Sequence, residues 1–290
     1  MTDLGKIMGL LITPFTDEEM VDYHKAAELA KEAAKSPGVD SLTAAATAGE
    51  FASLTFEERI KLFKTVKTAV DKPVIAGTGA ITTRETIALT KAAEEEAKVD
   101  AVVIMTPYFC NPTQKETYEH IKSVAQVTKL PVLLYNYGLT GVILNIDTIV
   151  ELSKITNIVG MKQAANPMDI PIIIRRAAQD FQVYSDPINL FLGASGMLGL
   201  AFPPLLNRMR EVIEQYEAGK EKEAFKLCYD LVKYGNVFYR NNPAPPFKCI
   251  MNLAGYQVGK PRLPLTEATE QERERIKKVL LDLKFIKSEV

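Results

Sequence analysis

The stretch Asn157-Ile-Val-Gly-Met-Lys162 runs from apolar residues into a single lysine, and the loop Gln163-Ala-Ala-Asn-Pro167 follows it. Such a run predicts a buried strand that delivers the lysine to a site or to solvent. A lysine that is desolvated at the mouth of a strand has a lowered pKa, and its free amine can attack a ketone to form a Schiff base. A strand-end lysine that simply extends its charge into water is the alternative, and this stretch alone does not exclude it.

The same order of strand and helix recurs on both sides of this stretch. Eight short apolar runs are each followed by a segment with helical periodicity. The predicted strands span residues 8–13, 39–46, 73–76, 101–105, 131–135, 157–162, 181–184 and 196–201, and the helices that follow them span residues 17–35, 55–70, 83–97, 113–128, 145–154, 168–178, 187–194 and 203–218.

This alternation predicts an α/β fold with parallel strands, because each strand needs a crossover helix to reach the next one. Eight units indicate a closed (β/α)8 barrel, the TIM barrel, for which 290 residues are sufficient. An open doubly wound sheet is the alternative. It would carry a glycine-rich phosphate loop after its first strand, where this chain has Thr13-Pro14-Phe15.

Beyond Gly219 the pattern changes to helices alone, separated by proline-rich breaks. These helices are predicted over residues 220–237, 245–254 and 267–285. We therefore predict a catalytic barrel over residues 1–219 and a C-terminal three-helix subdomain over residues 220–290.

Composition and charge exclude several classes of protein. The chain has 35 basic and 36 acidic residues, so no net field attracts nucleic acid or an anionic membrane. Three scattered cysteines favour a reducing compartment, and only His24 and His120, both expected on helix surfaces, can supply imidazole. Without a membrane-length apolar run or a basic leader before Asp3, we expect a cytoplasmic protein that binds no metal and no membrane.

Polar residues at the carboxyl ends of the predicted strands are the candidates for catalysis, because barrel enzymes place their reactive groups there. Tyr135 and Lys162 end neighbouring strands, so a phenol that moves protons would meet an amine over the barrel mouth. Thr47, after the second strand, can extend that proton relay or bind a substrate. Each of the three also has a structural alternative, such as a tyrosine that caps the core.

Candidate substrate contacts lie around the same rim. The backbone amides of Thr47, Ala48 and Gly49 stand in a loop that permits close approach and can hold a carboxylate. Tyr108 and Leu198, from the fourth and eighth units, are the other candidates. The next residue of the loop, Glu50, is interpreted as a structural hydrogen-bond partner.

With these residues in order, the chain resembles the dihydrodipicolinate synthase and N-acetylneuraminate lyase family of Schiff-base 2-oxo acid aldolases. The resemblance runs nearly end to end. It is carried by Thr13-Pro14-Phe15, Thr47-Ala48-Gly49-Glu50, Val74-Ile-Ala-Gly-Thr-Gly79, Thr106-Pro107-Tyr108, Leu134-Tyr135-Asn136, Ile158-Val-Gly-Met-Lys162 and Asn242-Pro243.

The resemblance implies a (β/α)8 barrel with a C-terminal helical extension. It implies that Lys162 forms an imine with pyruvate or another 2-oxo acid and that Tyr135 shuttles protons. No metal or organic cofactor is expected, the small-molecule partners would be pyruvate and an aldehyde, and the chain would form a homo-oligomer, either a dimer or a homotetramer.

Three positions depart from the pattern of the synthases in this family. Ala48 replaces a threonine whose hydroxyl binds a carboxylate, and Phe109 replaces a second tyrosine that completes a proton relay across the dimer. Leu139 is the best match for an arginine that meets the carboxylate of aspartate semialdehyde. A neutral aldehyde does not need that arginine, so the preferred assignment is a sugar-acid aldolase, such as one for 2-keto-3-deoxygluconate.

Other functions stay open. Within the resemblance they are a dihydrodipicolinate synthase (4-hydroxy-tetrahydrodipicolinate synthase), a neuraminate-type lyase, or a dehydratase that uses the same imine. From a different class, the alternative is a catalytically silent ligand-binding relative, against which the pairing of Lys162 with Tyr135 argues.

Overall fold

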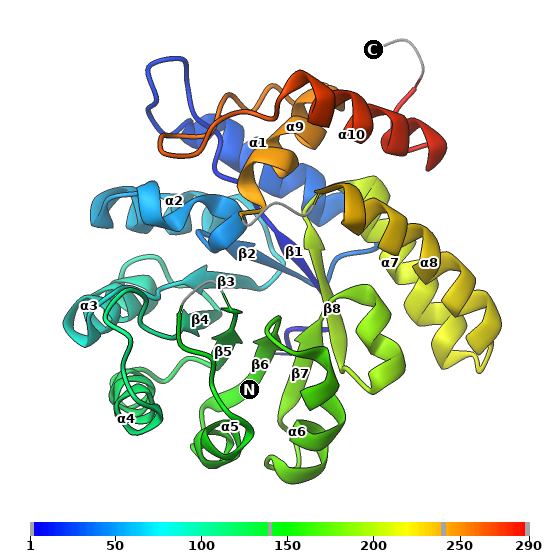
Figure 1. Cartoon of the computed structure of the whole chain (residues 1–290). Coiled ribbons are helices and arrows are strands. Elements are labelled where there is room, and N and C mark those ends of the chain that lie inside the picture. Colours follow the sequence, from blue (N-terminus) through cyan, green and yellow to red (C-terminus); the bar gives the residue numbers. More distant parts are fainter. Residues whose placement is uncertain (1–2, 139–140, 239–241, 288–290) are drawn as a thin grey trace.

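Eight parallel strands close into a barrel in chain order, with β8 paired to β1, and helices surround them (Figure 1). The computed structural model describes residues 3–138, 141–238 and 242–287, without side-chain detail for 236–238. The strands are β1 (Ile7–Leu10), β2 (Ser41–Ala44), β3 (Val74–Gly77), β4 (Ala101–Met105), β5 (Val132–Asn136), β6 (Ile158–Gln163), β7 (Gln182–Ser185) and β8 (Gly196–Leu200). The predicted TIM barrel is therefore confirmed.

The helices follow the predicted order, and several begin at side-chain caps. Thr55 and Glu58 form a reciprocal capping box at the start of α2, and Thr113 with Glu116 does the same for α4. The helices are α1 (Tyr23–Lys35), α2 (Phe56–Ala69), α3 (Thr83–Glu95), α4 (Gln114–Ala125), α5 (Ile146–Ser153), α6 (Ile170–Arg176), α7 (Pro203–Glu217), α8 (Glu221–Phe238), α9 (Ala244–Leu253) and α10 (Glu270–Asp282), with 3₁₀ turns η1 (Thr47–Gly49), η2 (Phe51–Ser53), η4 (Pro167–Asp169) and η5 (Pro187–Leu192).

Two of the predicted helices are partly wrong. The helix predicted over 17–35 begins at Tyr23, because the Asp22 side chain caps it by accepting a hydrogen bond from the Lys25 amide at 2.9 Å. The helix predicted over 187–194 is a 3₁₀ helix that ends at Leu192, because the next residue, Gly193, has a left-handed backbone with φ of 92°. The first strand is also shorter than predicted and ends at Leu10.

Apolar side chains form two buried layers. The larger layer lies between the strands and the surrounding helices. The smaller fills the barrel interior with inward-facing side chains, among them Met8, Ile75, Leu133, Tyr135 and Leu198. Since strand side chains alternate between the two faces, the inner layer ends at the barrel mouth with the residues proposed for chemistry.

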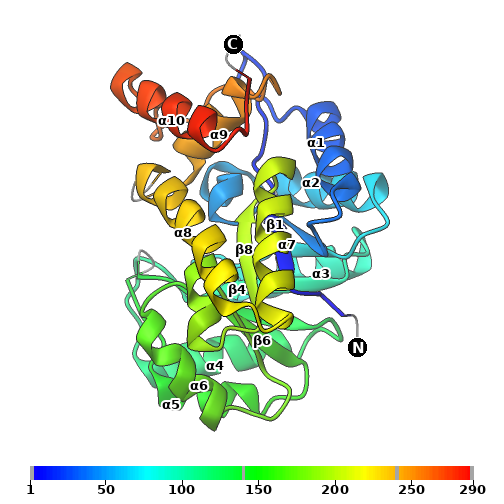
Figure 2. The same cartoon turned by 90° about the vertical axis from the view of Figure 1, so that its right-hand side faces the viewer.

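The C-terminal helices pack on the barrel and on one another. α8 lies along α7, α9 contacts η1, and α10 packs against α8 and α9 (Figure 2). The sequence-based division at residue 219 stays a prediction. The contact of α9 with η1 nevertheless places the C-terminal helices against the loop that follows β2.

A buried ion pair holds α9 on that loop. Lys248 Nζ lies 2.8 Å from Glu50 Oε1, and the two side chains are 1% and 0% exposed. Lys248 also donates to the Lys260 carbonyl at 2.8 Å, and Glu50 Oε2 accepts the Arg262 amide at 3.0 Å. Burial lowers the pKa of Lys248 to about 8, although the charge of Glu50 opposes that shift. The interpretation of Glu50 as a structural partner is therefore confirmed.

Replacing Lys248 by methionine tests how much this ion pair contributes to the stability of the fold. Lys248→Met should lower the free energy of unfolding by about 3–5 kcal/mol, because it leaves the Glu50 carboxylate buried without its cation. Urea denaturation followed by circular dichroism measures the change. Lys260→Met is the matched control, since Lys260 pairs with Glu267 at the exposed surface and should cost less than about 1 kcal/mol. Equal losses in the two variants would contradict the assignment.

Candidate active site

The register of β5 against β6 brings Tyr135 and Lys162 side by side. Val132 pairs with Ile158, but the next residue, Leu133, pairs with Gly160, so Val159 is skipped. Because of this irregularity Tyr135 is paired with Lys162 and not with Met161. Lys162 Nζ lies 4.4 Å from the centre of the Tyr135 ring, a cation–π geometry.

Thr47 approaches the same tyrosine from the loop after β2. Its Oγ1 donates to the Tyr135 hydroxyl at 3.5 Å, the outer limit of a hydrogen bond. Tyr135 is buried, whereas Lys162 and Thr47 are partly exposed. The structure thus brings together the three residues that the sequence nominated for catalysis.

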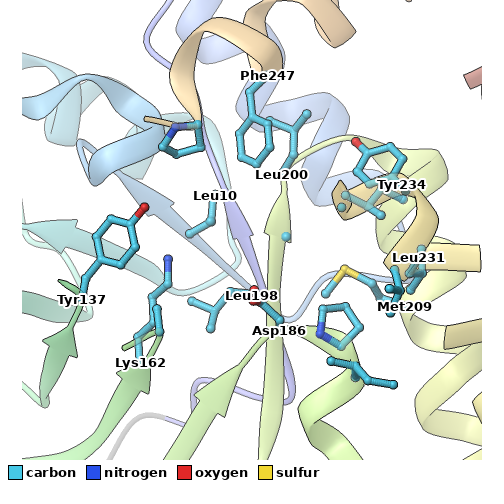
Figure 3. Close-up of a pocket in the computed structure, with 18 of the residues that line it drawn as sticks. Leu10, Tyr137, Lys162, Asp186, Leu198, Leu200, Met209, Leu231, Tyr234 and Phe247 are labelled. Atoms are coloured by element: carbon cyan, nitrogen blue, oxygen red, sulfur yellow. The ribbon is translucent and has the colours of Figure 1, made fainter. Parts of the chain in front are cut away.

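A cavity of about 320 Å³ opens beside Lys162, which is within the range of small-molecule sites. Figure 3 shows Lys162 and Tyr137 at one part of the cavity, and Met209, Leu231 and Tyr234 across β8 from them. The described residues that line it are Leu10, Tyr135, Tyr137, Lys162, Ala164, Asp186, Pro187, Ile188, Leu198, Gly199, Leu200, Leu205, Met209, Leu231, Val232, Tyr234, Gly235, Pro243 and Phe247. Lys162 is the one cation in this described lining, and most of the other residues are apolar.

Tyr137 is a site residue that the sequence analysis did not nominate. Its ring stacks on that of Tyr135, with centroids 5.4 Å apart and planes 8° from parallel. Burial, followed by the nearby Tyr135 and Asp186, raises the pKa of Tyr137 to about 12, so its phenol is neutral at pH 7. The two-residue spacing from Tyr135 was the available signal, because residues i and i+2 of an extended chain share a face.

The turn η1 offers fewer amides than predicted. The Gly49 amide donates to the Ala46 carbonyl at 2.9 Å, so it is already used. The Thr47 and Ala48 amides are the first two of the turn and have no acceptor within it. A carboxylate bound here would therefore meet these two amides.

Of the other nominated residues, some line the cavity and others do not. Leu198 lines it and also a small pocket of about 20 Å³ that Tyr135 and Lys162 line as well. Tyr108 is outside the described lining, and its ring packs against that of Phe51 in a T-shaped arrangement with centroids 5.9 Å apart. Phe109 projects from the loop after β4 and is 95% exposed. Leu139 lies outside the described residues.

The expected surface position of His120 is wrong. The ring is buried between α3 and α4, and its Nδ1 lies 2.9 Å from the Thr83 hydroxyl. Burial lowers the pKa of His120 to about 4, so the ring is neutral at pH 7. The sequence placed His120 on a helix, but it did not show that this face of α4 packs against α3.

The described part of the chain contains neither a cluster of metal ligands nor a membrane-spanning helix. Across residues 3–138, 141–238 and 242–287, histidine, cysteine and acidic side chains do not gather in threes as metal ligands would. In the same residues, no helix combines the length and apolarity required to cross a bilayer.

The geometry agrees with the match of the chain to a known family. The model of the dihydrodipicolinate synthetase family matches residues 3–283. This chain belongs to that family. It is accordingly a carbon–carbon lyase of the pyruvate-dependent aldolase type, and the resemblance inferred from the motifs is confirmed.

Individual relatives cover nearly the whole chain. A 4-hydroxy-tetrahydrodipicolinate synthase from Oceanobacillus iheyensis is 37% identical over 98% of this chain and 99% of its own length. The crystal structure of a dihydrodipicolinate synthase from Bacillus anthracis has a TM-score of 0.92, with 36% identity over 99% of this chain and all of that one. The enzyme from Acinetobacter baumannii, solved with pyruvate, has a TM-score of 0.90 and 34% identity over 98% of this chain and 100% of its own.

Proposed function

We propose that this protein joins pyruvate to an aldehyde, or cleaves the corresponding 2-oxo acid, through an imine on Lys162. The observation that supports the proposal most is the placement of the Lys162 amine in the cavity, 4.4 Å from the Tyr135 ring. The family of the chain supports pyruvate as one substrate, as does the relative solved with pyruvate.

In this proposal the Lys162 amine attacks the ketone carbon of pyruvate, and the resulting hydroxyl leaves as water to give the imine. Tyr135 donates the proton that this departure needs and recovers one afterwards. Loss of a proton from the methyl group then gives an enamine, whose carbon attacks the aldehyde. The amides of Thr47 and Ala48 hold the pyruvate carboxylate.

Removing the amine tests the proposal. Lys162→Ala should lower turnover at least about 10³-fold, because it removes the amine that forms the imine. Initial rates with pyruvate and aldehyde measure the loss, and circular dichroism checks the fold. Lys154→Ala, an exposed lysine at the end of α5, is the control and should retain the full rate. Substantial turnover by the Lys162→Ala variant would contradict the mechanism.

For the aldehyde, the relatives favour the reaction that the sequence analysis placed second. Relatives named 4-hydroxy-tetrahydrodipicolinate synthase are 36–38% identical over at least 96% of the chain. Their name supports aspartate semialdehyde as the partner of pyruvate, and we place this reaction first. The preferred sugar-acid aldolase receives no such support from the names of the relatives.

A neutral aldehyde stays the second candidate because of one structural observation. Apart from Lys162, which forms the imine, the described cavity lining contains no cation that would pair with the carboxylate of an acidic aldehyde. An arginine–carboxylate contact is worth about 1.5–3 kcal/mol, which is roughly ten- to a hundred-fold in specificity.

Comparing two aldehydes decides between these candidates. If the chain is a synthase, kcat/KM with pyruvate should be at least about tenfold higher for aspartate semialdehyde than for glyceraldehyde. A preference of the same size for glyceraldehyde would overturn the first candidate and support the sugar-acid aldolase. Coupled assays of product formation at fixed pyruvate provide both values.

We also propose that the protein is a homo-oligomer, a dimer or a tetramer. Apolar side chains project from loops that follow three consecutive strands, β3, β4 and β5. They are Ile81, Phe109 and Ile143, of which 41%, 95% and 47% is exposed. Light scattering on the eluted protein should give at least twice the chain mass, and a monomer at micromolar concentration would contradict the proposal.

A further inference from the structure

We propose that Tyr137 is a second phenol in the proton path of the active site and carries protons between Tyr135 and solvent. The proposal rests on the imine at Lys162 and adds a residue to its machinery. In the synthase pattern a second tyrosine comes from the position that is Phe109 here, so that hydroxyl is missing from this chain. Tyr137 would supply it from within the same subunit.

The chain path explains why two phenols stand together. Tyr135 is in β5 and Tyr137 lies just beyond its end, two residues on, so both side chains leave the strand on the same face. Their rings are 8° from parallel at a centroid distance of 5.4 Å. Both tyrosines line the cavity together with Lys162, and Figure 3 shows the Tyr137 hydroxyl directed into it.

Both phenols line the same cavity as Lys162, so a water molecule or a substrate oxygen inside it can bridge them. Such an oxygen makes hydrogen bonds of roughly 2.7–2.8 Å to each hydroxyl. When the leaving hydroxyl of the carbinolamine takes the proton of Tyr135, the bridge returns a proton to Tyr135 and receives one from Tyr137. Tyr137 is then reprotonated from solvent, and no net charge remains.

The surroundings of Tyr137 also fit a path to solvent. Tyr137 is only half-buried, whereas Tyr135 is 4% exposed and has no comparable access to water. Asp186, which is exposed at the cavity rim after β7, lies close enough for its charge to disfavour ionisation of Tyr137. The phenol therefore stays protonated between transfers, as a relay group must.

Exchange of the methyl hydrogens of pyruvate in deuterated water tests this role without knowledge of the aldehyde. Enamine formation at the imine replaces these hydrogens by deuterium, and proton NMR follows their loss. Tyr137→Phe keeps the stacked ring and removes only the hydroxyl. We expect exchange at least about tenfold slower in this variant. The amount of pyruvate trapped on Lys162 by borohydride at equilibrium should equal that of the unaltered protein.

Controls separate a relay from a structural role. Tyr229→Phe, at the exposed surface of α8, should exchange at the unaltered rate. In Tyr137→Phe, imidazole buffer should restore part of the lost rate, because a small diffusible acid and base can replace the missing hydroxyl. The unaltered protein should show little dependence on buffer concentration.

The outcomes are distinct. If Tyr137→Phe traps pyruvate normally and exchanges the methyl hydrogens at the unaltered rate, the inference is overturned. It is also overturned if the variant loses trapped pyruvate and exchange rate to the same extent and imidazole does not restore the exchange rate. An unaltered protein that traps no pyruvate would contradict the proposed function itself, and Tyr137 would then have no proton to carry.

Discussion

The register between β5 and β6 is the constraint on which the site depends. Val159 is skipped in the pairing, and this one-residue shift sets Lys162 beside Tyr135 where regular pairing would have set Met161. The closed barrel fixes every other strand around that pair, because β6 is also hydrogen-bonded to β7 and β5 to β4. The pairing of the amine with the first phenol therefore follows from a single irregularity in one ladder.

The C-terminal helices also help to form the active-site cavity. α9 contributes Phe247 to the cavity lining, and the next residue, Lys248, pairs with Glu50 in the barrel. Glu50 directly follows η1, has a left-handed backbone with φ of 53°, and donates its amide to the Thr47 carbonyl. A buried charge pair is costly unless both charges remain together, so the pair ties the position of α9 to that of η1, the turn proposed to hold the pyruvate carboxylate.

Periodicity and the residues at strand ends were sufficient to predict the barrel and the grouping of Lys162, Tyr135 and Thr47. They were sufficient because parallel strands all point their carboxyl ends to one rim, so order along the chain implies proximity in space. The use of the Gly49 amide, the burial of His120 and the pairing of Lys248 depend on packing between distant segments, which local pattern does not encode. The stack of Tyr137 on Tyr135 lies between these cases, because its spacing is visible in the sequence but its geometry is not.

Reductive trapping of pyruvate tests the central claim most directly. The protein is incubated with pyruvate and borohydride, digested, and analysed by mass spectrometry for the modified peptide. An imine at the barrel mouth predicts one reduced pyruvyl group per chain, located on Lys162. A protein that gains no mass, or that carries the group on another lysine, would contradict the account.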